Sequence, residues 1–232
     1  MRSKEFFPLV VLFATFPEAE PFLRETKAKR HLFNLKRILG KDESKPLRRF
    51  SKCFYEFDSP YKKAKALCLL TGVGFRSVED RLEFLFNNYD VGQVINVGLA
   101  GSLKGDFSYG LFVNVKEVLF LSSPAFSDRR SFLIDRTEGD DLFQASLLSV
   151  KKPLMEKKER ENLSVLADIV DMEAFKCVEV CRRWDVRHSV LKMISDQADE
   201  KAEECFYTLL PQLSKKLGQE VLAYLSQHKI FL

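Results

Sequence analysis

The stretch Val94-Ile-Asn-Val-Gly-Leu-Ala-Gly-Ser-Leu103 decides how the rest of this sequence is interpreted. Its apolar first half is typical of a buried strand. The two glycines and the alanine that follow would let a ligand approach the backbone closely, and ligands of open α/β sheets bind beyond the carboxyl ends of strands. The stretch therefore predicts a strand that runs into a small-residue turn at a ligand site, although a tight turn alone would also require glycine.

Comparable apolar runs recur along the chain and are continuous rather than alternating, which favours strands covered on both faces. They occupy residues 9–15, 66–71, 93–97, 111–121, 145–150 and 186–194. Helix-period stretches at residues 77–89 and 172–184 lie between them, and residues 198–228 should form a helix in which Pro211 is a candidate break. Residues 41–46 are the most loop-like and should join the first helix to a strand around residues 53–57. We expect one α/β domain over residues 1–232, with a central mixed, largely parallel sheet flanked by helices.

Charge and composition exclude several classes of protein. The net charge of +4 comes from 37 basic and 33 acidic residues, and the basic residues are scattered in interrupted runs. A nucleic-acid-binding protein would concentrate them on one face, so we expect no nucleic-acid partner. The apolar run at residues 6–16 imitates a signal peptide, but it is too short to span a bilayer and precedes no typical cleavage site. It is interpreted as a buried strand of a cytoplasmic protein without a membrane partner.

The five cysteines form no CxxC motif, and only three histidines accompany them. This pattern predicts neither a disulfide framework nor a metal site, and it favours a reducing compartment. Cys177 and Cys181 are four residues apart on a predicted helix, which would permit metal ligation, but two small buried thiols explain the spacing better. There is also no GxGxxG or P-loop motif, which disfavours dinucleotide and nucleoside triphosphate binding.

Two further segments deliver polar side chains after apolar runs. The first, Val170-Asp-Met-Glu-Ala-Phe175, places Glu173 at the expected start of a helix. This carboxylate would accept hydrogen bonds from both hydroxyls of a ribose or would only complement the helix dipole. The second, Met193-Ile-Ser-Asp-Gln-Ala-Asp-Glu200, delivers Ser195 and Asp196 to the end of a strand. Either of these residues would otherwise serve as a helix N-cap.

Taken together, the segments INVGLAGSL, VDMEAF and KMISDQADE resemble, in order and separation, the strand-end motifs of 5′-methylthioadenosine/S-adenosylhomocysteine nucleosidases and their purine nucleoside phosphorylase relatives. The Ser-Asp-x-Ala-Asp and Asp-Met-Glu elements are the specific part. The likeness covers most of the chain, because Thr71-Gly-Val-Gly74 matches a glycine turn before a long helix and Phe13-Ala-Thr-Phe-Pro-Glu18 matches the first strand and its acidic exit.

The resemblance implies an enzyme that hydrolyses the N-glycosidic bond of an adenosine-type, 5′-modified nucleoside and needs no cofactor. Asp196 would be the acid at purine N7, Glu173 would hold the ribose hydroxyls, and Glu18 would orient the attacking water. Such chemistry needs a protonated group at the leaving base, a carboxylate near the cation-like sugar and an activated nucleophile. The remaining implied substrate contacts are Met172 against the sugar, together with Ala100, Gly101, Leu154 and Ser195.

Several alternatives stay open. Glu20 competes with Glu18 as the N-terminal carboxylate, and Asp199 is either a neighbour that raises the pKa of Asp196 or a helix charge. Val150, Pro153 and Leu154 stand where relatives carry an aromatic base clamp, and Leu99 replaces a small polar residue. A phosphorylase using Arg24, Arg76 or Arg130 for phosphate is the runner-up, and a catalytically inactive nucleoside-binding protein is the alternative of another class. The family also implies a homodimer whose partner borders the 5′ pocket.

Overall fold

The structure is a computed structural model that describes residues 4–31, 52–59, 64–122, 128–134 and 141–227. Its helices are α1 (Phe16–Glu25), α4 (Phe75–Asn88), α5 (Lys157–Leu163), α6 (Ala174–Arg183) and α7 (Ala202–Gln227). Its strands are β1 (Glu5–Phe7), β2 (Val10–Phe13), β3 (Lys29–Arg30), β4 (Phe54–Asp58), β5 (Lys65–Leu70), β6 (Tyr89–Val91), β7 (Gln93–Ser102), β8 (Phe112–Leu121), β9 (Arg129–Leu133), β10 (Phe143–Ser149), β11 (Ile169–Asp171) and β12 (Arg187–Asp196).

One mixed sheet of ten strands organises the molecule, in the order β11-β10-β8-β12-β7-β2-β5-β4-β3, with β9 paired to β8. The neighbours β12, β7, β2 and β5 run parallel, whereas β8 and β4 run antiparallel to β12 and β5. Strand β11 pairs with β10 on one side and with β7 on the other, so this end of the sheet closes into a ring. Strand β10 also runs parallel to β8 and β11. The predicted α/β fold with a mixed, largely parallel sheet is confirmed.

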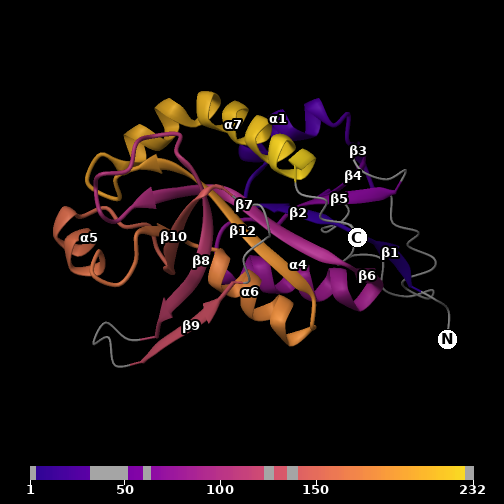
Figure 1. The fold of residues 1–232 in the computed structure, drawn as a ribbon, viewed down its shortest axis with the longest axis horizontal. Helices are drawn as coiled ribbons and strands as arrows, with labels where there is room; N and C mark the ends of the chain where they lie inside the picture. The colour runs from indigo at the N-terminus through magenta and orange to yellow at the C-terminus, as the bar shows by residue number, and fades with distance from the viewer. Residues whose placement is uncertain (1–3, 32–51, 60–63, 123–127, 135–140, 228–232) are drawn as a thin grey trace.

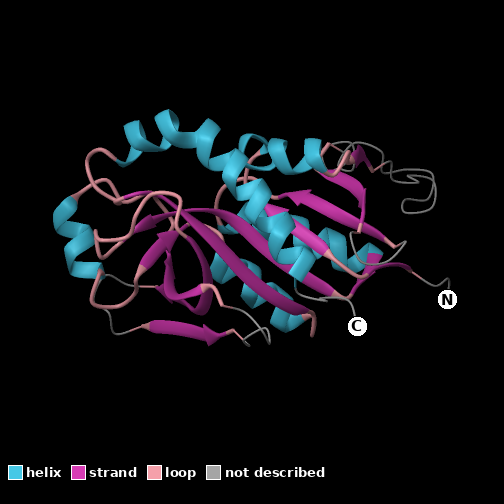
Figure 2. Cartoon of the chain, turned by 45° about the horizontal axis from the view of Figure 1, so that its top comes forward, coloured by secondary structure: helices cyan, strands magenta, loops and turns pink. Residues whose placement is uncertain are grey.

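Helices cover both faces of the sheet because its central strands are apolar on both sides. Helices α1 and α7 lie along one face and α4 and α6 along the other (Figure 1). Phe22 and Leu217 pack into one core, and Leu82 and Val180 pack into the other. Figure 2 shows the long helix α7 crossing above the strands. At this crossing Gly218 lets α7 approach α1, since an added Cβ would lie 3.0 Å from the Phe22 nitrogen.

Three details of the sequence prediction were wrong. Strand β7 does not turn at the small residues but continues as a buried strand to Ser102. The strand predicted at residues 9–15 is β2, which ends at Phe13 because Thr15 is already the N-cap of α1. Helix α7 runs through Pro211 without a break. The predicted loop at residues 41–46 lies outside the described residues.

The glycines of β7 make room for neighbouring side chains within the sheet. An added Cβ at Gly101 would lie 2.7 Å from Asp196 Oδ1. At Gly98 it would face Lys192 Nζ at 3.4 Å and Glu18 Oε1 at 3.5 Å. Close approach to functional groups, rather than a turn, therefore explains the small residues that follow the apolar run. Within the described part of the chain, no helix is long and apolar enough to cross a membrane.

Candidate active site

A cavity of about 450 Å³ opens where the parallel strands β2, β7 and β12 end. The eight residues predicted from the sequence all line it: Glu18, Ala100, Gly101, Leu154, Met172, Glu173, Ser195 and Asp196. They come from five separate parts of the fold and meet because the carboxyl ends of parallel strands share one edge of the sheet. Of the carboxylates among them, Asp196 is 9% exposed and Glu173 7%.

Asp196 ends β12 and is held at both oxygens. Its Oδ1 accepts a hydrogen bond from the Ala198 amide at 2.8 Å, and its Oδ2 lies 2.6 Å from Ser195 Oγ. Burial raises the pKa of Asp196, the two hydrogen bonds oppose this shift, and the nearby Asp199 carboxylate adds to it. Of the two roles considered for Asp199, the structure therefore favours that of a neighbouring charge that raises the pKa of Asp196.

The Ser195 hydroxyl suits both protonation states of Asp196. It lies within hydrogen-bonding distance of the Ala100 carbonyl, at 3.3 Å, as well as of the carboxylate. A hydroxyl group has one proton to donate and lone pairs to accept with. It can donate to ionised Asp196, or donate to Ala100 and accept from protonated Asp196. The carboxyl group is therefore oriented in both protonation states.

Glu173 lies at the start of α6, as predicted, but its side chain does not cap that helix. Its Oε1 instead accepts a hydrogen bond from the Gly74 amide at 2.8 Å, which links it to the glycine turn before α4. Burial and the Asp171 carboxylate raise the pKa of Glu173 to about 7, while Lys192 and the Gly74 amide oppose the shift. A carboxyl group in this state changes charge near neutral pH.

Glu18 is the N-terminal carboxylate that faces the cavity, whereas Glu20 is exposed and pairs with Arg24. Thr15 and Glu18 form a capping box at the start of α1, in which Glu18 Oε2 accepts from the Thr15 amide at 2.9 Å and from its hydroxyl at 2.8 Å. Glu18 Oε1 accepts from the Leu99 amide at 3.2 Å. Pro17 occupies the first turn, where proline is tolerated.

A buried lysine, which the sequence analysis missed, lies behind these carboxylates. Lys192 is 2% exposed and its Nζ lies 2.9 Å from Asp171 Oδ2. Burial alone would lower its pKa, but the carboxylates of Asp171, Glu173 and Glu18 hold that pKa above its usual value. One lysine inside the apolar run of β12 was the available signal, because a buried ammonium group requires a partner.

Asp171 is the second residue missed, and its role is structural. Its Oδ1 accepts from Ser149 Oγ at 2.6 Å and its Oδ2 from the Ala174 amide at 2.9 Å. With the Lys192 ion pair, these bonds fix β11 and β12 against the start of α6. Asp171 therefore orients the segment that carries Met172 and Glu173.

The remaining wall is mostly apolar. Val150, Pro153 and Leu154 line it as the sequence suggested, and Met155 joins them. Val73, Phe206 and Tyr207 line it as well. The sequence predicts that Phe206 and Tyr207 lie on a helix. The spacing of apolar residues along that helix does not show which of them reach the cavity.

All charged side chains among the described residues that line the cavity are acidic: Glu18, Asp171, Glu173, Asp196 and Glu203. Arg24 pairs with Glu20, Arg130 with Glu179, and Arg76 is exposed, so none of the candidate phosphate donors lines this cavity. No group of three or more His, Cys, Asp or Glu side chains suited to hold a metal occurs in the part of the chain that the structure describes.

The fold and site define an α/β protein with a carboxylate-rich cavity at the carboxyl ends of its parallel strands. No protein-family model and no curated protein matches the sequence. Among solved structures, a 5′-methylthioadenosine/S-adenosylhomocysteine nucleosidase of Helicobacter pylori matches with a TM-score of 0.77, 18% identity, and coverage of 97% of this chain and 100% of that one. A futalosine hydrolase mutant of Helicobacter pylori matches with a TM-score of 0.75 and 17% identity, over 95% of this chain and 99% of that one. The nucleosidase of Streptococcus pneumoniae in complex with 8-aminoadenine matches with a TM-score of 0.75 and 15% identity, over 94% of this chain and 99% of that one.

These likenesses show that the chain has the same fold as these nucleosidases and this futalosine hydrolase.

Proposed function

We propose that this protein is a nucleosidase that hydrolyses the N-glycosidic bond of an adenosine-type, 5′-modified nucleoside and releases adenine. The observation that carries the proposal is the joint placement of Asp196, Glu173 and Glu18 around one cavity. The likeness to solved nucleosidases and to a futalosine hydrolase supports the reaction class. The proposal needs no cofactor.

In the first step Asp196 acts on the leaving base. Its raised pKa favours a protonated carboxyl group, which donates a proton to purine N7 as the bond between C1′ and N9 breaks. The bonding electron pair leaves with the base, so protonation at N7 makes the base a better leaving group. A positioned acid of this kind is typically worth about 10²–10⁴-fold in rate.

In the second step the carboxylates act on the sugar. Glu173 accepts hydrogen bonds from the ribose hydroxyls, and its negative charge stabilises the cation-like sugar. Glu18 retains lone pairs beyond the three protein hydrogen bonds that fix it, and these orient a water toward C1′ and accept its proton. The products are the free base and the 5′-substituted ribose.

The acidic lining favours water over phosphate as the nucleophile. A phosphate would need arginine or lysine donors, and the described lining residues include none. The ammonium group of Lys192 is already paired with Asp171 and lies behind the carboxylates. Negative potential in a partly enclosed site repels anions, so we infer hydrolysis rather than phosphorolysis.

The substrate class follows from the rest of the lining. Val150, Pro153 and Leu154 form an apolar clamp for the base, and Met172 packs against the ribose. Val73, Phe206 and Tyr207 then receive an apolar 5′-substituent, with Glu203 as the acidic group nearby. Val73 is 53% exposed and Tyr207 66%. Exposed apolar residues at a cavity mouth suit a homodimer in which the partner covers the 5′ end.

The experiment is a chromatographic assay of adenine and hypoxanthine release from a panel of 5′-substituted adenosines and inosines, with and without phosphate. We expect phosphate-independent adenine release that is lost in Asp196→Asn and Glu18→Gln. Glu20→Gln, on the exposed side of the same helix, is the matched control and should retain activity. Dependence on phosphate would identify a phosphorylase instead. Purine binding without release would leave a catalytically inactive nucleoside-binding protein.

A further inference from the structure

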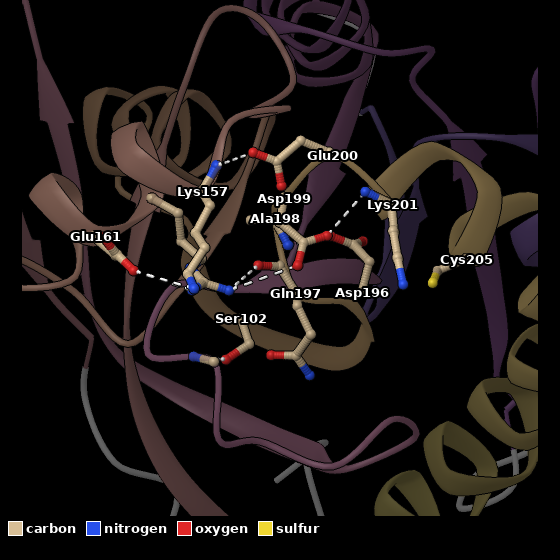
Figure 3. A network of polar contacts seen from close by, with 12 residues as sticks. Ser102, Lys157, Glu161, Asp196, Gln197, Ala198, Asp199, Glu200, Lys201 and Cys205 are labelled. Carbon is tan, nitrogen blue, oxygen red and sulfur yellow. Dashed lines mark hydrogen bonds and ion pairs between the residues drawn. The ribbon is translucent and has the colours of Figure 1, made fainter.

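Helix α5 and the segment after Asp196 hold each other through two reciprocal contacts. From α5, Arg160 Nη1 donates to the Gln197 carbonyl at 3.2 Å. From the segment, the Glu200 carboxylate accepts from the Lys157 amide at 3.0 Å, as Figure 3 shows. One contact uses a backbone group of the segment and the other a backbone group of the helix. The pair therefore fixes the backbones of both elements.

The Arg160 guanidinium is built into the protein rather than solvated. Its side chain is 12% exposed, and Nη1 lies 3.8 Å from Asp199 Oδ2. An added Cβ at Gly105 would lie 3.3 Å from Nη1, so the glycine after β7 makes room for it. Arg160 thus bridges the loop after β7 and the segment after β12, which end the two strands that carry the site.

The segment held by Arg160 includes a strained residue that contacts Asp196. Ala198 has a φ of 49°, in the left-handed region that residues other than glycine rarely adopt. In this conformation its amide donates to Asp196 Oδ1 at 2.8 Å. A strained conformation persists only where the surroundings hold it. The contacts from Arg160 to Gln197 and from Glu200 to Lys157 flank Ala198 and supply that restraint.

The other end of α5 connects to the opposite wall of the cavity. Leu154 and Met155, which line the cavity, immediately precede Glu156, the N-cap of α5. A purine that packs against this wall and a carboxyl group that reaches its N7 are therefore positioned through the same short helix.

We propose that Arg160 is a positioning residue that holds the segment 197–200 so that the Ala198 amide orients the carboxyl group of Asp196. The proposal rests on the proposed nucleosidase function. Glu200 acts with Arg160 from the other side, so the two side chains form one restraint. Because neither touches the substrate, their loss should lower the rate of the chemical step more than substrate binding.

The test compares Arg160→Met, Arg160→Lys and Glu200→Ala with Arg24→Met, which removes an exposed arginine paired with Glu20 on α1. We expect kcat to fall about 10–100-fold in Arg160→Met, because a small misplacement of a reacting group lowers the rate by about this factor. KM should change less than about threefold. Arg160→Lys, which can still donate to Gln197, should recover part of kcat. The double variant Arg160→Met/Glu200→Ala should lose no more kcat than about the larger of the two single variants, because both changes release the same segment.

Hydrogen exchange of the amides in residues 196–202 gives a readout that needs no turnover, and exchange should accelerate in Arg160→Met and Glu200→Ala but not in Arg24→Met. Unchanged kcat and exchange, or a KM effect as large as the kcat effect, would overturn the proposal. If Arg160→Met fails to fold, Arg160→Lys and Glu200→Ala decide. If the wild type releases no purine, the proposed function fails, and the restraint is judged from hydrogen exchange and the adenine affinity of the same variants.

Discussion

Gly101→Ala should impair catalysis by displacing the carboxyl group of Asp196. The new Cβ would lie 2.7 Å from Asp196 Oδ1, whereas ordinary contact begins near 3.4 Å, so the carboxyl group must move by the difference, about 0.7 Å. The backbone of Gly101 does not lie in the left-handed region, so alanine adds no backbone strain. The added Cβ would also lie 3.1 Å from Ala198 Cβ and 3.3 Å from Val170 Cγ1, so the stability cost should fall in the range for overpacking, about 1–3 kcal/mol.

The displaced oxygen is the one that the Ala198 amide holds, and a misplacement of this size should lower kcat about 10–100-fold. The assay is steady-state adenine release together with urea unfolding of the same preparations. Gly98→Ala is the comparator in the same strand. Its Cβ would meet Lys192 Nζ at 3.4 Å and Glu18 Oε1 at 3.5 Å, which are ordinary contact distances, so its effect should stay below about fivefold. A Gly101→Ala protein with kcat within about twofold of wild type would refute the assignment of Asp196 to the reaction.

Three further predictions concern the charges of the site. The pKa of Glu173 is about 7, above its unfolded value of 4.5, so its contribution to stability is lost as the pH rises between these values. At pH 8 the free energy of unfolding of Glu173→Gln, measured with urea, should therefore be about 1–3 kcal/mol higher than that of wild type, although adenine release is lost. Equal stability at pH 8 would contradict the raised pKa. Lys192→Met leaves buried Asp171 without its counter-ion and should cost about 3–5 kcal/mol in urea unfolding at pH 7, whereas a loss below about 1 kcal/mol would show that the pair is dispensable. Glu203→Lys should raise kcat/KM for carboxylate-bearing 5′-substituents relative to the methylthio compound by about 3–10-fold, a modest factor because Glu203 is exposed, and an unchanged ratio would remove Glu203 from the 5′ end.

The strands and helices that build the site could be predicted because each buries a long apolar run. Strand β12 and helix α4 have this pattern, and the carboxylates that follow or precede such elements were therefore placed at the cavity edge. The sequence analysis assigned Glu18 to the site and left Glu20 as its competitor. The spacing of Thr15 and Glu18, which is that of a capping box, is a further sequence feature that favours Glu18. Pro17 is compatible with this helix start.

Other features could not be predicted because they depend on contacts between distant residues. Strand β11 has three residues, too few for a periodic pattern, and its pairing with β7 involves residues almost 70 positions apart. Gly98 and Gly101 resemble a turn in the sequence, and only the side chains of Lys192 and Asp196 opposite them explain why β7 continues. The contact between Arg160 and Gln197 joins helix α5 to the segment after β12, and no local sequence pattern encodes their proximity.

The closed ring of strands has a consequence for how the protein is made. Strand β7 can pair with β2 as soon as both have left the ribosome, but β11 and β12 are synthesised some 70 or more residues later. Pairings over such separations form late, because the entropy of closing the intervening chain must be overcome first. Until then the glycine edge of β7 has no neighbour on that side. Purine release therefore reports that the last strands have docked, and it would serve as a sensitive assay of complete folding in cells.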